Sequence, residues 1–285
     1  MSSFDPVPAS LIDQFDDEHD GYPDDLAVED TTANLKMMGA RDFPAHLWIE
    51  PKEWAAVAAE NDRYNTWPED YRNRFTNQSP THECTCHSLT QQFEIAYNRQ
   101  RHGAGDAIFV SPLSIYAEAN PRIRGGANIQ TVLSICIRRG FLPEYHGPDG
   151  PNTQRNKYKH TIVGTQGKGN PMNSGGDWVA LSRFPTDWKD TARHLRALEC
   201  INVDQWEQMV CLVLHGIAVG VGRNGHAIPY TRWMAKDGVM EYTDSYDVHR
   251  YDSQRTMRSA VGGAHAIVST TVPDDWYKPV ADEVR

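Results

Sequence analysis

One stretch decides the fold, and it reads Asn77-Gln78-Ser79-Pro80-Thr81-His82-Glu83-Cys84-Thr85-Cys86-His87-Ser88. Beyond it, apolar residues recur at spacings of three and four (Cys86, Leu89, Phe93 and Tyr97). This period predicts a helix from Cys84 to Arg99 with one buried face. A cysteine in the first turn lies at the positive end of the helix dipole, which favours the thiolate. Cys84 is therefore a candidate nucleophile, although a buried structural cysteine at a helix start is also common.

A metal site is the alternative interpretation of the same stretch. His82, Cys84, Cys86 and His87 are all potential metal ligands within six residues. Zinc sites, however, favour two to four residues between paired cysteines and a distant second pair, which this sequence lacks. The Cys-x-x-Cys-His pattern of covalent haem attachment is also missing. We therefore predict no metal and no cofactor.

The rest of the chain predicts helices followed by strands. A second helix follows Asn128, a suitable N-cap, and ends before Gly140. A third amphipathic stretch covers residues 203–214, and Gly- and Lys-rich residues 145–174 predict a long connecting loop. Stretches rich in β-branched and aromatic residues predict strands at 227–233, 239–243 and 264–271. This order indicates an α+β fold.

A second candidate for chemistry is His226, which interrupts an apolar run at the head of a predicted strand. Its small neighbours, Gly225 and Ala227, should leave the ring accessible. The alternative is a turn histidine with a purely structural role. Eighteen residues later, Asp244 ends the next predicted strand, so adjacent strands would bring its carboxylate to the ring. Such a group is the orienting third member that nucleophile–base catalysis requires.

Charge is concentrated at the N-terminus. Met1 to Asp30 hold ten Asp or Glu and no Lys or Arg, and the 28 acidic residues left from the total of 38 equal the 28 basic ones. Residues 1–35 therefore predict a flexible acidic arm, or a docking segment for a basic protein partner, and 36–74 a lead-in segment that packs on the core. Nothing in the charge pattern favours nucleic acid.

Localisation is constrained by what the chain lacks. No run of eighteen apolar residues predicts a membrane span. The N-terminus has no basic cluster followed by an apolar stretch, so we expect no secretory signal. Five cysteines, an odd number, fit a reducing compartment. These features favour a cytoplasmic or virion-associated protein.

Taken together, these motifs resemble the papain-like cysteine peptidases. Gln78 stands six positions before Cys84, the pair Gly125-Gly126 precedes the second helix, and His226 follows Cys84 by 142 residues. The resemblance covers roughly residues 75 to 272 and implies a two-lobed domain over 75–285, with a helical lobe around the nucleophile helix and an antiparallel β lobe carrying the histidine.

The resemblance also implies roles. Cys84, His226 and Asp244 would be the catalytic residues, and the Gln78 side chain with the Cys84 amide would form the oxyanion hole. Gly125 and Gly126 would approach the backbone of a peptide or protein substrate.

The departures from the family motifs leave a second function open. Asp244 stands where the family has asparagine, and its charge would favour the imidazolium form of the histidine. Thr85 and Tyr246 replace aromatic residues beside the nucleophile and the His–Asn bond. The alternative is therefore a weak or inactive papain-fold component of a phage virion or other assembly.

The CHAP amidases share a Cys-Thr helix start, but their histidine follows far sooner. His265 repeats the histidine motif without a following acid, which suggests a structural position on a late strand.

Overall fold

The computed structural model describes residues 42–61, 83–100, 109–119, 126–143, 188–245 and 248–271. The predicted arm at 1–35 and the predicted loop at 145–174 lie outside these ranges. The helices are α3 (Trp54–Asn61), α5 (Cys84–Gln100), α6 (Pro112–Ala119), α7 (Ile129–Arg138), α9 (Trp188–Ala192), α10 (Trp206–Leu214) and α11 (Gln254–Ser259), with short 3-10 turns η2 (Ala45–Leu47) and η3 (Pro51–Glu53). None of the helices in these ranges combines the length and the apolar character that crossing a membrane requires.

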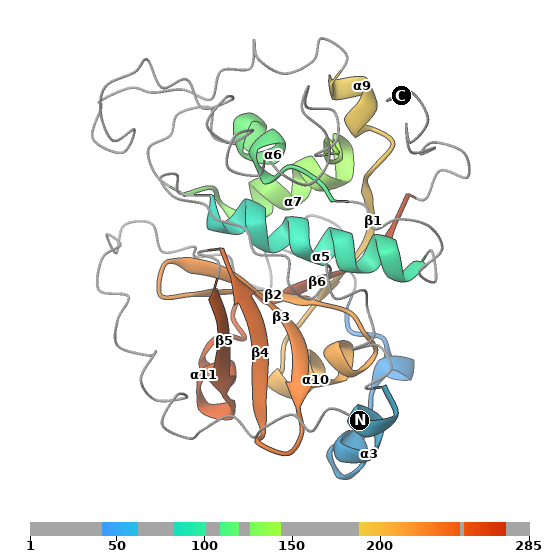
Figure 1. Ribbon diagram of the computed structural model, residues 1–285, viewed down its shortest axis with the longest axis vertical. Coiled ribbons are helices and arrows are strands. Elements are labelled where there is room, and N and C mark those ends of the chain that lie inside the picture. Colours follow the sequence, from blue (N-terminus) through green and yellow to red (C-terminus); the bar gives the residue numbers. More distant parts are fainter. Residues whose placement is uncertain are drawn as a thin grey trace, which may run out of the picture.

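Six strands form one sheet in which every neighbouring pair is antiparallel. They are β1 (Ala197–Asn202), β2 (Val219–Arg223), β3 (His226–Met234), β4 (Val239–Asp244), β5 (Val248–Ser253) and β6 (His265–Thr270). Their order across the sheet is β1-β6-β2-β3-β4-β5. The helices α6 and α7 lie on the far side of α5 from the sheet (Figure 1). The predicted α+β fold, with helices around Cys84 and antiparallel strands carrying His226, is confirmed.

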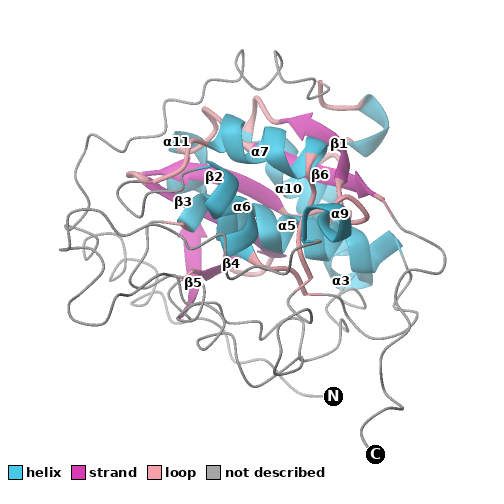
Figure 2. Cartoon of the chain, turned by 90° about the horizontal axis from the view of Figure 1, so that it is seen from above, coloured by secondary structure: helices cyan, strands magenta, loops and turns pink. Residues whose placement is uncertain are grey.

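The helix α5 is the central element of this arrangement. Fourteen of its seventeen residues are buried, because it packs against α6 and α7 on one side and against β3 and β6 on the other (Figure 1). Seen from above, α5 lies among the other elements (Figure 2). Several of its buried polar side chains bond to backbone groups, as the Gln91 amide does to Thr243 O (3.3 Å). Satisfied in this way, they can be buried without the penalty of an unpaired polar group. The predicted start of the helix at Cys84 is confirmed.

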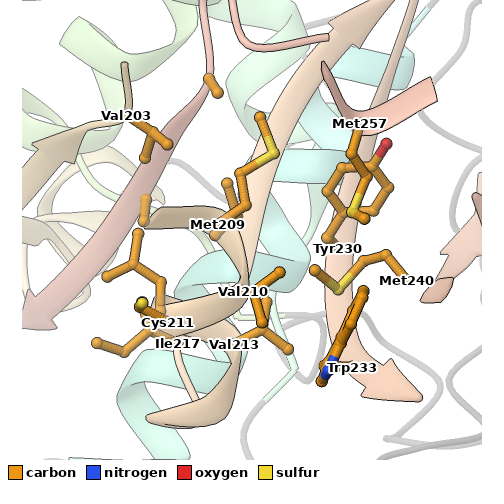
Figure 3. Packing of buried hydrophobic residues seen from close by; sticks show 14 of the residues in the cluster. Val203, Met209, Val210, Cys211, Val213, Ile217, Tyr230, Trp233, Met240 and Met257 are labelled. Atoms are coloured by element: carbon orange, nitrogen blue, oxygen red, sulfur yellow. The ribbon is translucent and has the colours of Figure 1, made fainter. Parts of the chain in front are cut away.

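Two apolar clusters flank the site. The helical core joins α5, α6 and α7 to the facing residues of β1 and β6. In it the rings of Phe93 and Phe141 contact each other in a tilted arrangement, at 4.3 Å between ring centroids. The sheet core joins α10 and α11 to β2, β3 and β4. Side chains of α10, such as Met209 and Val210, lie beside Tyr230 and Trp233 of β3 in this core (Figure 3). The molecule thus has two packed interiors with α5 between them.

The start of α3 and the residues before it also pack on the sheet core. The Trp54 ring contacts Trp206 and Trp233 edge-on, at 5.5 and 5.7 Å between centroids. The Trp54 indole N–H donates to Ile49 O (3.0 Å), which anchors η3 and α3 beside α10. The exact limits of the predicted lead-in segment, 36–74, stay a prediction.

The second predicted helix, α7, begins and ends at the residues expected. The Asn128 side chain accepts hydrogen bonds from the backbone N–H groups of Gln130 and Thr131, at 2.9 and 3.2 Å. Gly140, at a φ of 90°, turns the chain after the last turn. An N-cap acceptor and a glycine in the left-handed region are the ordinary signals for these two ends.

Candidate active site

Cys84 is the first residue of α5, and its side chain is nearly covered, at 8% exposure. The first hydrogen bond of the helix runs from His87 N–H to Glu83 O (3.0 Å). The amide of Cys84 therefore precedes the helical ladder and points from the positive end of the dipole. The His226 ring and the Ala227 backbone lie close enough to the sulfur that both lower the pKa of the Cys84 thiol. The nucleophile predicted from sequence thus has a histidine beside it.

His226 is the first residue of β3, directly after a two-residue turn. Asn224 and Gly225 have φ of 49° and 72°, and this turn pairs Arg223 with His226 across β2 and β3. Residues with positive φ at both central positions form the turn that suits a tight hairpin. The ring is only 11% exposed, so the expectation of an accessible ring was wrong. Small neighbours in sequence did not leave it open, because contacts from Cys84 and Asp244 cover it.

Asp244 ends β4 and contacts the histidine as the sequence predicted. The His226 Nε2 atom lies 2.9 Å from Asp244 Oδ1, and the carboxylate is 1% exposed. The Ser245 hydroxyl donates to the same oxygen at 3.3 Å. The other oxygen, Oδ2, lies 3.0 Å from Nε of Arg250 on β5. With Nε2 facing Asp244, Nδ1 is the ring nitrogen left to interact with the Cys84 sulfur.

The electrostatics of the pair favour a thiolate and an imidazolium. Burial raises the pKa of Cys84, but the combined effects of His226, the Ala227 backbone and Thr85 outweigh it, so the net pKa is lowered. Burial likewise lowers the pKa of His226, and its bonds to Asp244 and Cys84 outweigh burial and raise the pKa from 6.5 to about 9. Opposite shifts in two touching groups are typical of a nucleophile held ready by its base.

The other polar residues at the start of α5 have different surroundings. Cys86 is fully buried in the helical core, and burial raises the pKa of its thiol well above 9.0. The His87 ring lies 3.5 Å from the Glu83 carboxylate one turn earlier. Among the described residues, no three His, Cys, Asp or Glu come together in a way that could hold a metal ion, and His82 lies outside them.

His265 is a buried part of the sheet, as its motif suggested. Its Nδ1 lies 3.1 Å from Gly263 O, and its Nε2 lies 3.3 Å from the Gln92 amide nitrogen. The Gln92 amide can only donate there, so the ring accepts at Nε2 and carries its proton on Nδ1. Burial lowers the pKa of His265 to about 4, against a smaller opposing effect of the Gly263 bond. This histidine ties β6 to α5 as a neutral ring.

The remaining predicted site residues are covered only in part. Gln78 and Gly125 lie outside the described residues, and Gly126 stands partly buried two residues before the N-cap Asn128. Sequence reasoning missed Arg250, whose charge reaches Asp244 from the next strand. The alternation of Arg250 and Asp252 along β5 could have indicated a polar face turned inward.

No protein-family model matches the chain, and no curated protein matches it in sequence. In fold, the chain is similar to papain-like cysteine proteases. One is xylellain, a cysteine protease from Xylella fastidiosa, at 14% identity and a TM-score of 0.49, covering 68% of this chain and 82% of that one.

Two further structures are comparably similar. The clostridial cysteine protease Cwp84 aligns at 12% identity and a TM-score of 0.48, over 70% of this chain and 55% of that one. The procathepsin B S9 from Trypanosoma congolense aligns at 10% identity and a TM-score of 0.47, over 83% and 81%. At such low similarity, the assignment of chemistry rests on Cys84, His226 and Asp244 themselves.

Proposed function

We propose that this chain is a papain-like cysteine peptidase that hydrolyses peptide or related amide bonds through Cys84, His226 and Asp244. The observation that carries the proposal is the His226 ring, which lies 2.9 Å from Asp244 Oδ1 and also lowers the pKa of the Cys84 thiol at the start of α5. Nucleophile, base and orienting acid come from α5, β3 and β4, so tertiary structure brings them together. This is the geometry by which a base activates a nucleophile.

Acylation would begin from the ion pair. The Cys84 thiolate attacks the carbonyl carbon of the substrate amide, and the carbonyl π electrons move onto the oxygen. As the carbonyl re-forms, the C–N bond breaks and His226 gives its proton to the departing amine. The products are a thioester on Cys84 and a free amine. Asp244 holds the ring in the orientation that this proton transfer needs.

Deacylation would reverse the role of the histidine. Neutral His226 takes a proton from water, and the resulting hydroxide equivalent attacks the thioester carbonyl. The C–S bond then breaks, the electron pair returns to the sulfur, and the carboxylic acid leaves. The enzyme is restored as thiolate and imidazolium, so atoms and charges balance over the cycle.

The oxyanion would be stabilised by the Cys84 amide, which precedes the first helical hydrogen bond. The resemblance adds the Gln78 side chain as the second donor, and Gly125 and Gly126 as the residues that approach the substrate backbone. These three assignments remain proposals, as does docking of the acidic arm on a protein partner in the cytoplasm or a virion.

The decisive experiment compares Cys84→Ala with Cys86→Ala in two assays. Thiol labelling with iodoacetamide, followed by peptide mapping, reports thiolate reactivity, and digestion of a mixed peptide library followed by mass spectrometry reports hydrolysis. We expect Cys84→Ala to abolish both signals. Cys86→Ala should retain most of each, because that side chain faces the helical core. Circular dichroism checks that both variants fold.

Two outcomes would count against the proposal. If Cys84 labels no faster than a free cysteine at neutral pH, the site is not activated and an inactive structural component becomes the better description. If Cys86→Ala alone loses hydrolysis while it folds normally, the nucleophile has been assigned to the wrong cysteine.

A further inference from the structure

The carboxylate of Asp244 is held from two sides. Its Oδ1 faces the His226 ring at 2.9 Å, and its Oδ2 faces Arg250 Nε at 3.0 Å. Tyr242 pairs with Arg250 in the β4–β5 register, so Arg250 lies on the same face of the sheet as Asp244 and two residue pairs away. Both Asp244 and Arg250 are largely buried, at 1% and 12% exposure. Their interaction is therefore screened little by solvent.

Four groups of alternating charge follow one another through the site. In the ion-pair form of the site they are the Cys84 thiolate, the His226 imidazolium, the Asp244 carboxylate and the Arg250 guanidinium, contributed by α5, β3, β4 and β5. Without Arg250 the series would carry a net negative charge inside the protein. With Arg250 it is neutral, and neutral sets of buried charges avoid much of the desolvation cost.

The other charged groups near the site have partners of their own. Arg223, opposite His226 in the register, lies 2.6 Å from Asp252, and Asp252 also accepts a hydrogen bond from Tyr230 (2.7 Å). His249 on β5 lies 3.4 Å from Glu241. Arg223 is thus balanced by Asp252, while the described cation that contacts Asp244 from the side opposite His226 is Arg250.

We infer that Arg250 is a positioning residue that fixes the Asp244 carboxylate and offsets its charge, so that His226 is held as an imidazolium but can still release its proton. This inference rests on the proposed function for its catalytic meaning. A carboxylate whose charge is not offset would bind the imidazolium proton more tightly, and a tightly held proton is passed slowly to a leaving amine. The Asp244–Arg250 pair carries no net charge, as the asparagine of the resembled family would.

The test is an ordered series of titrations of the His226 ring by NMR, with the signal assigned by its loss in His226→Gln. Removing the positive charge in Arg250→Gln should raise the midpoint by about one pH unit. Asp244→Asn should lower it by at least as much, because Arg250 then acts on the ring without opposition. The double variant Asp244→Asn/Arg250→Gln, which is again neutral, should return close to wild type, and Arg250→Lys, which keeps the charge, should also stay close.

A matched control is Arg232→Gln, which removes a cation that pairs with Glu241 (3.7 Å) between β3 and β4. It should leave the His226 midpoint unchanged. The pH dependence of Cys84 labelling gives a second readout. The pH at which labelling changes on the alkaline side should shift among the variants in the same order as the His226 midpoints. If Arg250 had a purely structural role, these variants would change in stability, but their His226 titration midpoints would not follow the expected order.

The inference is overturned if Arg250→Gln titrates like wild type, or if the double variant titrates like Asp244→Asn alone. Should Arg250→Gln not fold, the comparison of Asp244→Asn with the double variant decides alone. Failure of the proposed function would look different, since wild type would then hydrolyse no peptide while the order of the midpoints still held.

Discussion

Acid should destabilise the protein through His265, a residue away from the catalytic pair. The ring is 1% exposed and is held neutral between Gly263 O and the Gln92 amide, with its pKa lowered to about 4. In the unfolded chain the same ring titrates near 6.5. As the pH falls below 6.5 the unfolded state takes up a proton that the folded state refuses until about pH 4. The stabilisation is therefore complete above pH 6.5 and is lost as the pH falls toward 4.

The size of this loss follows from the two pKa values, since each pKa unit corresponds to about 1.4 kcal/mol. The free energy of unfolding should fall by about 3 kcal/mol across the window because of His265 alone. Urea unfolding followed by tryptophan fluorescence, for wild type and His265→Gln at a series of pH values, isolates this contribution, because the other titrating groups cancel in the difference. His265→Asn should behave like His265→Gln. A difference that stays constant from pH 6.5 to about 4 would refute the buried neutral ring.

Three more perturbations follow from the structure. Gly140→Ala should lower the free energy of unfolding by about 3 kcal/mol, because a Cβ there meets a backbone oxygen at 2.0 Å and φ is 90°. Gly262→Ala, where a Cβ has no atom within 4 Å, should leave the melting temperature nearly unchanged. Equal melting temperatures of the two variants in thermal denaturation would contradict this. Asn128→Ala should cost about 1 kcal/mol by loss of the N-cap, measured by urea unfolding, and no loss would show the cap to be unimportant. His226→Ala leaves Cys84 with the effect of burial and without its main compensation, so the pKa of the thiol, followed by labelling against pH, should rise; a fall would contradict the ion pair.

The elements that the sequence predicted have strong local signals. The helix at Cys84 has an apolar face with spacings of three and four, and α7 has an N-cap at Asn128 and a glycine, Gly140, just after its end. The strands β3, β4 and β6 are dense in β-branched and aromatic residues. The contact of His226 with Asp244 could be predicted because both residues lie at the ends of adjacent strands joined by a short turn.

The strand β5 could not be predicted from apolar periodicity, and Arg250 was missed with it. Its inward side chains include Arg250 and Asp252, which are buried because each pairs with an opposite charge on another strand. A charged residue is expected to be exposed to solvent unless its partner is known. The partners of Arg250 and Asp252 are Asp244 on β4, six residues away, and Arg223 on β2, 29 residues away. The strand β1 was missed for a similar reason, because Glu199 and Asn202 interrupt its apolar residues.

The position of α5 between two interiors also determines how the site can fail. Cys84 belongs to a helix whose apolar side chains pack in the helical core, while His226 and Asp244 belong to strands of the sheet core. Cys84 and His226 therefore lie on either side of the boundary between the two interiors, and partial opening along that boundary would separate them while both interiors remain folded. Hydrogen exchange at the first amides of α5 and β3 reports this subglobal opening. Loss of Cys84 thiolate reactivity on mild heating thus reports separation of the two interiors, whereas tryptophan fluorescence reports the unfolding of the interiors themselves.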